Sequence, residues 1–282
     1  MLAGDHHAAR SLNGEAGEAL LLAREIARDA AEILREGWRA VTSASNVGVG
    51  FKRGRTDLVT DYDHRSEASI VRALAHACPD DAIVAEESGA RGARGARRRW
   101  LVDPLDGTTN FVHGLPLFAI SIGLEIEGEL AAGVVVAPAL DWEFAGCTGG
   151  GATWNGRAIA VSSDDALERA LLVTGFPYDR ATHPDNNFAN WERFQRRAQG
   201  VRRLGAAALD LCFVAAGWLD GYWEFRLSPW DLAAGAVIAR EAGARTSDWR
   251  GGLLRIDAGE IVCSNGRIHD AMLAVLRGDA TS

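Results

Sequence analysis

Two carboxylates, Asp103 and Asp106, stand in a tight turn directly after an apolar stretch, and this feature limits the fold most strongly. In "LVDPLDGTTNF", residues 101–111, Pro104 favours a turn and Gly107 follows at once. A β-turn before a capped helix would explain the turn. It would not explain two neighbouring anionic side chains, which repel one another unless a cation lies between them. We therefore expect a strand to deliver this turn into a site that holds a cation.

Composition is that of an ordinary globular protein. The chain has 282 residues, 48% of them hydrophobic and 24% charged, with a formal net charge of -8. This length predicts two ordinary domains or one large unit with a continuous core. The acidic balance makes nucleic acid an unfavourable partner, and an anionic substrate would need a local cation or dipole. Four scattered cysteines without a CxxC pair indicate neither a zinc site nor a disulfide framework.

The N-terminus is predicted to be a flexible tail over residues 1–14. It lacks the basic region and the uninterrupted apolar core of a signal peptide, and no apolar run of the chain reaches membrane-spanning length. We therefore expect a cytoplasmic protein with no membrane partner.

Hydrophobic periodicity predicts helices and strands in two abutting halves that form one compact catalytic unit. The N-terminal α+β half, 15–150, carries most candidate ligands, and the C-terminal α/β half, 151–282, carries Glu224 and Asp231. Glycines interrupt the pattern between the first two helices. Helices are predicted over 22–41, 66–77, 187–197, 205–217, 230–244 and 267–276, and strands over 81–88, 99–103, 170–177, 219–225, 245–249 and 260–265, with a hairpin from Leu117 and a turn at Asn155-Gly156.

The segment 89–99, "GARGARGARRR", contains five arginines. It could bind an anion or RNA, but a solvated loop between two strands is the better interpretation.

Carboxylates that end predicted elements can converge on one cleft, because side chains at strand ends and helix N-termini project out of the sheet layer. These carboxylates are Asp63, Glu86, Asp103, Asp106 and Asp231. With the Leu105 carbonyl as a further candidate, the ligands are oxygens only, which suits Mg²⁺ better than zinc. Two ions sharing Asp103 could clamp the attacking and leaving oxygens of a phosphoryl transfer, and the N–H groups of Gly107 and Thr108 could hold the phosphate.

Each acid also has an ordinary structural explanation. Asp231 and Asp63 could cap helices, and Glu86 could be a solvated strand end. "DPLDGT" also resembles the Asp-x-Asp motif of haloacid-dehalogenase-type phosphatases, but its acids are three residues apart, which changes the face that the second side chain occupies.

Six motifs in order resemble the inositol monophosphatase family, within the fructose-bisphosphatase and inositol-phosphatase superfamily. They are "DLVTDYD", "AEES", "LVDPLDGTTNFVHGLP", "RRLGAAALDLCFVAAG", "GYWEF" and "WDLAAGAVIAREAGA". The resemblance implies an α+β fold, a layered α-β-α-β-α sandwich of the sugar-phosphatase type. It also implies a homodimer that hydrolyses phosphate monoesters with two to three Mg²⁺ ions per subunit and is inhibited by lithium.

The resemblance further assigns ligands and catalytic residues by position. It implies a first metal site at Glu86, Asp103, Leu105 O and Thr108, a second at Asp103, Asp106 and Asp231, and a weaker third at Asp63 and Glu86. Thr108 would orient the attacking water, with Glu86 or Asp63 behind it. Substrate contacts would come from Asp106, Gly107, Thr108, Ala207, Glu224 and Asp231, and from Lys52 in the mobile loop 50–57. For His113 we expect a packing or hydrogen-bonding role.

The substrate that the resemblance favours is inositol-1-phosphate. Fructose-1,6-bisphosphate, histidinol phosphate and adenosine 3′,5′-bisphosphate are alternatives within the same chemistry. A regulatory protein that keeps the fold without turnover, and a sugar-binding protein without metals, are alternatives of another class.

Overall fold

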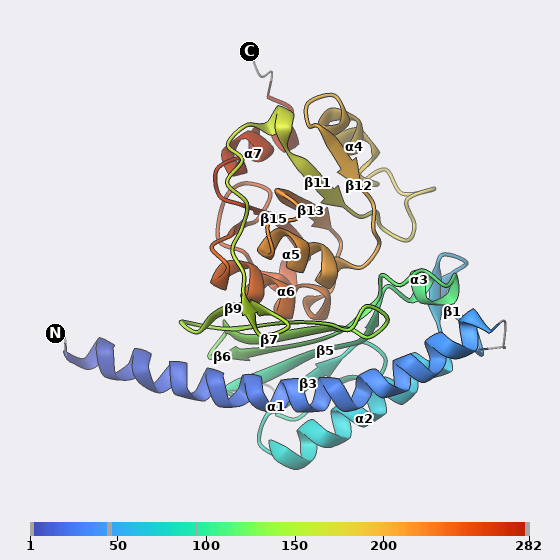
Figure 1. Cartoon of the computed structure of the whole chain (residues 1–282), viewed down its shortest axis with the longest axis vertical. Helices are drawn as coiled ribbons and strands as arrows, with labels where there is room; N and C mark the ends of the chain where they lie inside the picture. The colour runs from blue at the N-terminus through green and yellow to red at the C-terminus, as the bar shows by residue number, and fades with distance from the viewer. Residues whose placement is uncertain (1–2, 44–46, 94, 280–282) are drawn as a thin grey trace.

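Five layers of helices and sheets stack in the computed structural model, which describes residues 3–43, 47–93 and 95–279 (Figure 1). Two helices lie under an eight-stranded sheet, two more separate it from a five-stranded sheet, and a final pair covers the outer face. The predicted α-β-α-β-α sandwich is confirmed.

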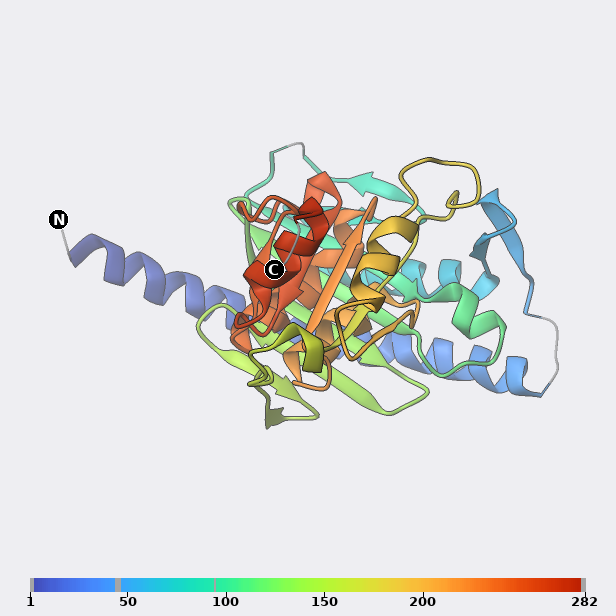
Figure 2. The same ribbon diagram turned by 90° about the horizontal axis from the view of Figure 1, so that it is seen from above.

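The first layer consists of α1 (Ala3–Thr42) and α2 (Asp61–Ala77). Small and apolar side chains at helical spacing, among them Ala27, Ala30 and Leu34, are buried against the sheet. Residues 3–14, predicted as a flexible tail, continue α1, whose first turns project beyond the rest of the molecule (Figure 2). Among the described residues, no helix is long and apolar enough to cross a membrane.

The eight-stranded sheet has the order β10-β9-β8-β7-β6-β5-β3-β4. Its strands are β3 (Ala82–Ala85), β4 (Gly89–Arg91), β5 (Arg98–Asp106), β6 (Ala119–Ile126), β7 (Glu129–Ala137), β8 (Trp142–Cys147), β9 (Gly151–Trp154) and β10 (Arg157–Ala158). The predicted hairpin is β6–β7, and the turn at Asn155-Gly156 joins β9 to β10. The predicted division after residue 150 therefore separates β9 and β10 from the sheet they complete.

The central layer, α5 (Ala207–Ala215) and α6 (Pro229–Glu241), packs closely on this sheet. A Cβ on Gly133 of β7 would lie 2.5 Å from Ala234 O of α6, and one on Gly123 of β6 would lie 2.6 Å from Ala233 Cβ. Small residues on both surfaces thus allow the close approach. That approach sets the position of the N-terminus of α6 relative to β5.

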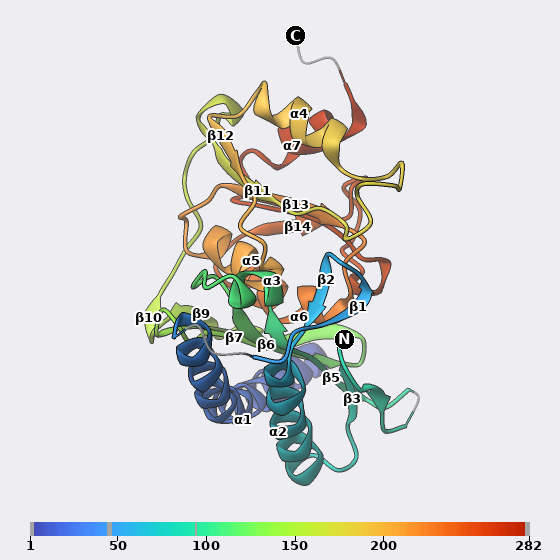
Figure 3. The same cartoon turned by 90° about the vertical axis from the view of Figure 1, so that its right-hand side faces the viewer.

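The five-stranded sheet has the order β12-β11-β13-β15-β14, and α4 and α7 cover its outer face (Figures 1 and 3). Its elements are β11 (Leu171–Thr174), β12 (Gly200–Arg202), β13 (Gly221–Phe225), β14 (Arg245–Ser247), β15 (Glu260–Ser264), α4 (Phe188–Gln195) and α7 (His269–Arg277). Short 3-10 turns, η1 (Leu167–Arg169) and η2 (Ile256–Ala258), precede β11 and β15. Sequence analysis did not predict β12.

Two predicted loops are partly strands. The glycine-interrupted segment before α2 forms an antiparallel hairpin, β1 (Gly50–Gly54) and β2 (Asp57–Val59), beside the short helix α3 (Thr108–Val112) (Figure 3). Within 89–99, β4 pairs with β3 and β5 begins at Arg98, while residue 94 lies outside the described residues. Periodicity missed these strands because they are too short to show an alternating pattern.

Candidate active site

The turn between Asp103 and Asp106 lies at the end of β5, where the strand bulges against β6. Asp103 pairs with Ser121 and Asp106 with Ala119, so three steps along β5 match two along β6. The bulge compensates for the odd spacing of the two acids, and Asp106 lies close enough to Asp103 to raise its pKa further, after burial and Glu86. Leu105 N donates to Asp103 Oδ1 at 3.0 Å and fixes the turn from within.

Gly107 turns the chain from β5 into α3. Its φ of 86° is left-handed, and a Cβ here would lie 2.9 Å from Leu117 O, so only glycine fits. The next residue, Thr108, places Oγ1 3.1 Å from both Asp63 Oδ1 and Leu105 O. The hydroxyl can donate to one of these and still accept a hydrogen bond from another group.

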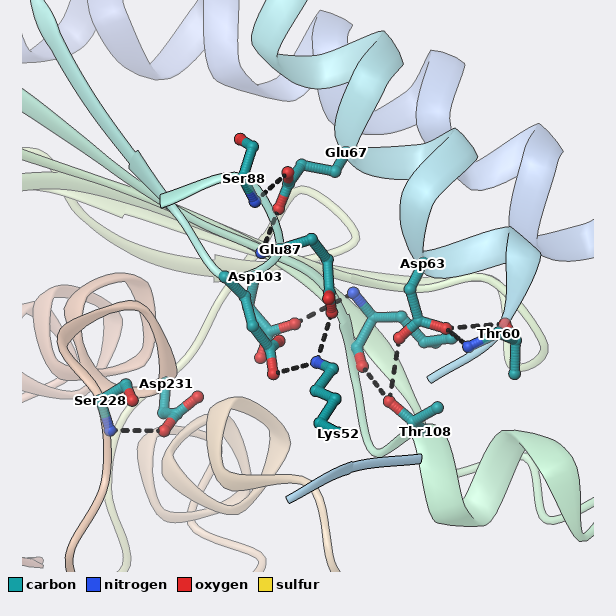
Figure 4. Close-up of polar contacts among 12 residues, drawn as sticks. Lys52, Thr60, Asp63, Glu67, Glu87, Ser88, Asp103, Thr108, Ser228 and Asp231 are labelled. Carbon is teal, nitrogen blue, oxygen red and sulfur yellow. Dashed lines mark hydrogen bonds and ion pairs between the residues drawn. The ribbon is translucent and has the colours of Figure 1, made fainter. Parts of the chain in front are cut away.

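Asp63 is fully buried at the N-terminus of α2 and faces this turn (Figure 4). Its Oδ2 accepts from Thr60 N at 2.8 Å and from Thr60 Oγ1 at 2.7 Å, which completes a capping box. Burial raises the pKa of Asp63 to about 6, although the Thr60 hydrogen bonds oppose the shift. One carboxylate therefore caps a helix with one oxygen and approaches Thr108 with the other.

Glu86 follows β3 and forms an ion pair with Lys52 of the β1–β2 hairpin, with Lys52 Nζ 2.8 Å from Glu86 Oε1. The same ammonium group also bonds to Glu87. From α2, the buried Glu67 accepts the backbone N–H groups of Glu87 and Ser88 at 2.7 and 2.8 Å. Glu67 thereby holds the turn that carries Glu86.

Asp231 approaches the site from the first turn of α6, opposite β5, and its Oδ2 accepts from Ser228 N at 2.7 Å (Figure 4). Asp106 reaches towards α5, where its carboxylate accepts from Ala207 N at 3.2 Å and Ala208 N at 2.8 Å. The N–H of Ala207, a predicted substrate contact, is therefore already engaged. The Asp106 contacts tie the turn at the end of β5 to α5, which lies far along the chain.

The carboxylates in this site raise one another's pKa. Burial is the main cause for Asp103, followed by repulsion from Glu86, Asp106 and Asp231. Burial raises the pKa of Asp106 to about 7, against hydrogen bonds from the N-terminus of α5. The pKa of Asp231 is raised by burial first and then by repulsion from Glu86. Acids from both halves of the chain therefore meet at one place, as expected.

The oxygen ligands of this site fit a hard cation in their chemistry. They are Asp63, Glu86, Asp103, Leu105 O, Asp106 and Asp231, without a soft ligand among them. In the side-chain positions of the described residues, no group of three Asp, Glu, His or Cys residues is arranged to hold an ion. Side chains would have to rotate to bind one, and Lys52 would have to share Glu86. Mutual repulsion among the acids favours that rearrangement, because a divalent ion would relieve it.

Sequence analysis missed several residues around the site. Glu67 carries no motif of its own, and its role depends on a loop 20 residues later. Tyr178 is 54% exposed, and its carbonyl accepts a hydrogen bond from Thr56 Oγ1 at 2.8 Å. His113 is exposed, which contradicts the packing role, one of the two roles predicted for it, and leaves the hydrogen-bonding role a prediction.

Comparison with known proteins gives the family. The model of the inositol monophosphatase family matches residues 17–281. The chain belongs to the inositol monophosphatase family. Within this family, an inositol-1-monophosphatase from Synechocystis is 46% identical over 226 residues, which is 80% of this chain and 79% of that protein. Nus factor SuhB from Pseudomonas aeruginosa is 41% identical and covers 92% of this chain and 95% of its own length.

Solved inositol monophosphatases share the fold. The structure from Anabaena superposes with a TM-score of 0.84 at 40% identity and covers 94% of this chain and 97% of its own. The chain is therefore a phosphatase with an inositol monophosphatase fold.

Proposed function

We propose that this phosphatase hydrolyses inositol-1-phosphate to inositol and phosphate and depends on Mg²⁺. The observation that carries the proposal is the approach of Asp231, from α6, to Glu86 and Asp103 in the other half of the chain. The relatives from Synechocystis and Mesorhizobium japonicum named inositol-1-monophosphatase, 46% and 40% identical, support the substrate.

Mg²⁺ held by Glu86, Asp103, Leu105 O, Asp106 and Asp231 would supply Lewis acidity to the attacking water and to the leaving oxygen. The chain's own groups orient the reactants. Thr108 Oγ1 can accept a hydrogen bond from the attacking water while donating to Asp63 Oδ1 at 3.1 Å. Thr60 fixes the other Asp63 oxygen, so the oxygen that Asp63 offers to the Thr108 hydroxyl is held in place. Glu86 stands beside this pair as a proton acceptor.

The phosphate and the alcohol would contact different sides of the site. The N–H groups of Gly107 and Thr108 are assigned to phosphate oxygens, and Lys52 supplies positive charge beside Glu86. Glu224 and Asp231 are assigned to the hydroxyls of the alcohol. Hydroxyl recognition by buried carboxylates discriminates strongly, since a missing hydroxyl leaves a buried acceptor unpaired.

Phosphate release from inositol-1-phosphate, measured with Mg²⁺ and with EDTA, tests the proposal. We expect turnover with Mg²⁺, almost none with EDTA, and inhibition by Li⁺. Turnover that is unchanged by EDTA would contradict the metal dependence. A panel ranked by kcat/KM, with fructose-1,6-bisphosphate, histidinol phosphate and adenosine 3′,5′-bisphosphate, decides the substrate. Light scattering tests the proposed homodimer, and cell fractionation tests the proposed cytoplasmic location.

A regulatory role is the second candidate, because several relatives at 39–43% identity are named Nus factor SuhB or putative Nus factor SuhB. The arginine segment is poorly suited to binding RNA. Arg97 pairs with Glu15, and Arg99 pairs with Glu125 and Asp257. RNA titration at two salt concentrations separates the two roles, since binding through phosphates weakens steeply with salt.

A further inference from the structure

The Glu224 carboxylate lies directly against the backbone of Gly175, the residue after β11. A Cβ built on Gly175 would lie 2.0 Å from Glu224 Oε1 and 2.2 Å from Glu224 Cδ. Real Cβ atoms do not approach this closely, so any side chain at position 175 must displace either the backbone of Gly175 or the carboxylate of Glu224. The φ of Gly175 is not in the left-handed region. Gly175 therefore provides room for the Glu224 carboxylate and is not required by the backbone conformation.

The backbone at Gly175 is held in place and cannot easily withdraw. The buried Asn187 donates from Nδ2 to Gly175 O at 2.8 Å and to Thr174 Oγ1 at 2.9 Å. Asn187 is itself fixed, because Trp223 Nε1 donates to its Oδ1 at 3.0 Å. The Thr174 hydroxyl also bonds to Trp223 O, which joins β11 to β13. A side chain at position 175 would therefore displace Glu224.

Tyr222 fixes the carboxylate from another side. Its Oη donates to Glu224 Oε2 at 2.8 Å, and its ring is fully buried. The Glu224 carboxylate is also near enough to Asp106 and Asp231 for repulsion between them to affect their pKa values. Glu224 thus faces the site from a position that Gly175 and Tyr222 define together.

We propose that Gly175 is a specificity-determining position and Tyr222 a positioning residue. Together they set the Glu224 carboxylate where it accepts hydrogen bonds from the hydroxyl groups of the alcohol portion of the substrate. This inference rests on the proposed function, because it takes Glu224 as the group that contacts the alcohol. The phosphate side depends less on Gly175, because the three atoms nearest to a Cβ at position 175 all belong to Glu224 and none to Thr108, Asp103 or Gly107. A larger residue at 175 should therefore impair recognition of the alcohol more than the chemistry.

Two substrates test the inference. Inositol-1-phosphate carries hydroxyls on its alcohol, and p-nitrophenyl phosphate carries none. For Gly175→Ala we expect kcat/KM on inositol-1-phosphate to fall about tenfold, mainly through KM, because a hydrogen bond to a charged acceptor is lost. On p-nitrophenyl phosphate we expect a change of about twofold at most. Tyr222→Phe should show the same preference with a smaller loss, about threefold.

Controls separate a local effect from a general one. Gly200→Ala places a Cβ in the same sheet, with the side chain of Arg202 as the closest contact at 3.1 Å, and should leave both substrates unaffected. The double variant Gly175→Ala/Glu224→Ala should match Glu224→Ala alone, because the group through which Gly175 acts is already missing. Equal losses on both substrates, additive losses in the double variant, or an unchanged kcat/KM on inositol-1-phosphate would each overturn the inference.

A crystal structure of Gly175→Ala keeps the inference testable if the proposed function fails. Wild-type protein that hydrolyses neither ester would reject the proposed function. In that case the position of the Glu224 carboxylate in the variant tests the inference. A displaced carboxylate supports the positioning by Gly175, and an unmoved carboxylate contradicts it.

Discussion

Buried acids occur in this protein in two contrasting settings. The buried Glu125 on β6 pairs with Arg99, and the half-buried Glu143 on β8 pairs with Arg24 and Arg28. The acids of the candidate site instead face one another, and Lys52 is the cation seen in contact with Glu86. For Glu125 and Glu143, the chain supplies its own arginines. At the candidate site, the negative charge of the acids is left to be balanced by a bound cation.

The largest expected effect comes from exchanging one acid in each setting for its amide. Asp231→Asn should lower kcat by about a thousandfold or more, because it removes an ionic ligand from the reacting end of the site. Glu125→Gln should retain kcat per folded molecule but lose about 1–3 kcal/mol of unfolding free energy, since Arg99 is left without its buried partner. Activity and urea unfolding of both variants check this. Comparable activity losses would erase the distinction between the two settings.

Mg²⁺ should stabilise the wild-type protein and not the Asp231→Asn variant. At about 100 times its dissociation constant, a ligand that binds only the folded state adds about 2.7 kcal/mol, which is about 5 °C or more in Tm for a chain of this size. Melting curves in EDTA and in a Mg²⁺ series measure the shift. The Glu125→Gln variant, matched in charge change, should keep the wild-type shift. A shift that survives in Asp231→Asn would place the ion elsewhere.

Stability without metal should fall as pH rises from about 4 to 7. Burial raises the pKa of Asp63 to about 6 and that of Asp106 to about 7, so the folded protein binds more protons than the unfolded chain in this window. The unfolding free energy must then decrease with pH. Calorimetry in EDTA between pH 5 and 8 measures the slope, and saturating Mg²⁺ should flatten it. Stability that rises over pH 6.5–8 in EDTA would contradict the raised pKa values.

The smallest effect concerns Asp210 on α5, a buried acid that is not among the candidate ligands of the site. Neither carboxylate oxygen has a hydrogen-bond partner among the described residues, and burial, then Glu224, raises the pKa of Asp210. Asp210→Asn should therefore differ little from wild type near pH 4 and become the more stable protein as pH rises, by about 2–4 °C at pH 8. Melting temperatures of both proteins at pH 5 and pH 8 decide this. A gap that does not widen with pH would mean that the Asp210 carboxyl is paired in solution.

Sequence patterns predicted the long elements, and six motifs predicted the family. The helices α1, α2 and α6 and the hairpin β6–β7 follow from apolar periodicity, which reflects a requirement that each element meets by itself. The turn at 103–107 follows from proline, aspartate and glycine, whose backbone preferences are local. The short strands β1, β4 and β12 were not predicted, because glycine and basic residues make up most of each and leave no apolar run to mark them. The role of Glu67 was not predicted, because its hydrogen-bond partners are backbone N–H groups of another segment.

By itself, the sequence determined which segments fold into most of the helices and strands, where the tight turn lies, and that several acidic side chains stand at element ends. Only the tertiary structure decided that Asp106 binds the N-terminus of α5, that Arg99 is neutralised by Glu125, and that Gly175 must lack a side chain because Glu224 lies against it. The first group depends on local sterics and periodicity, which neighbouring residues specify. The second depends on contacts between segments far apart in the chain, which exist only after the layers pack.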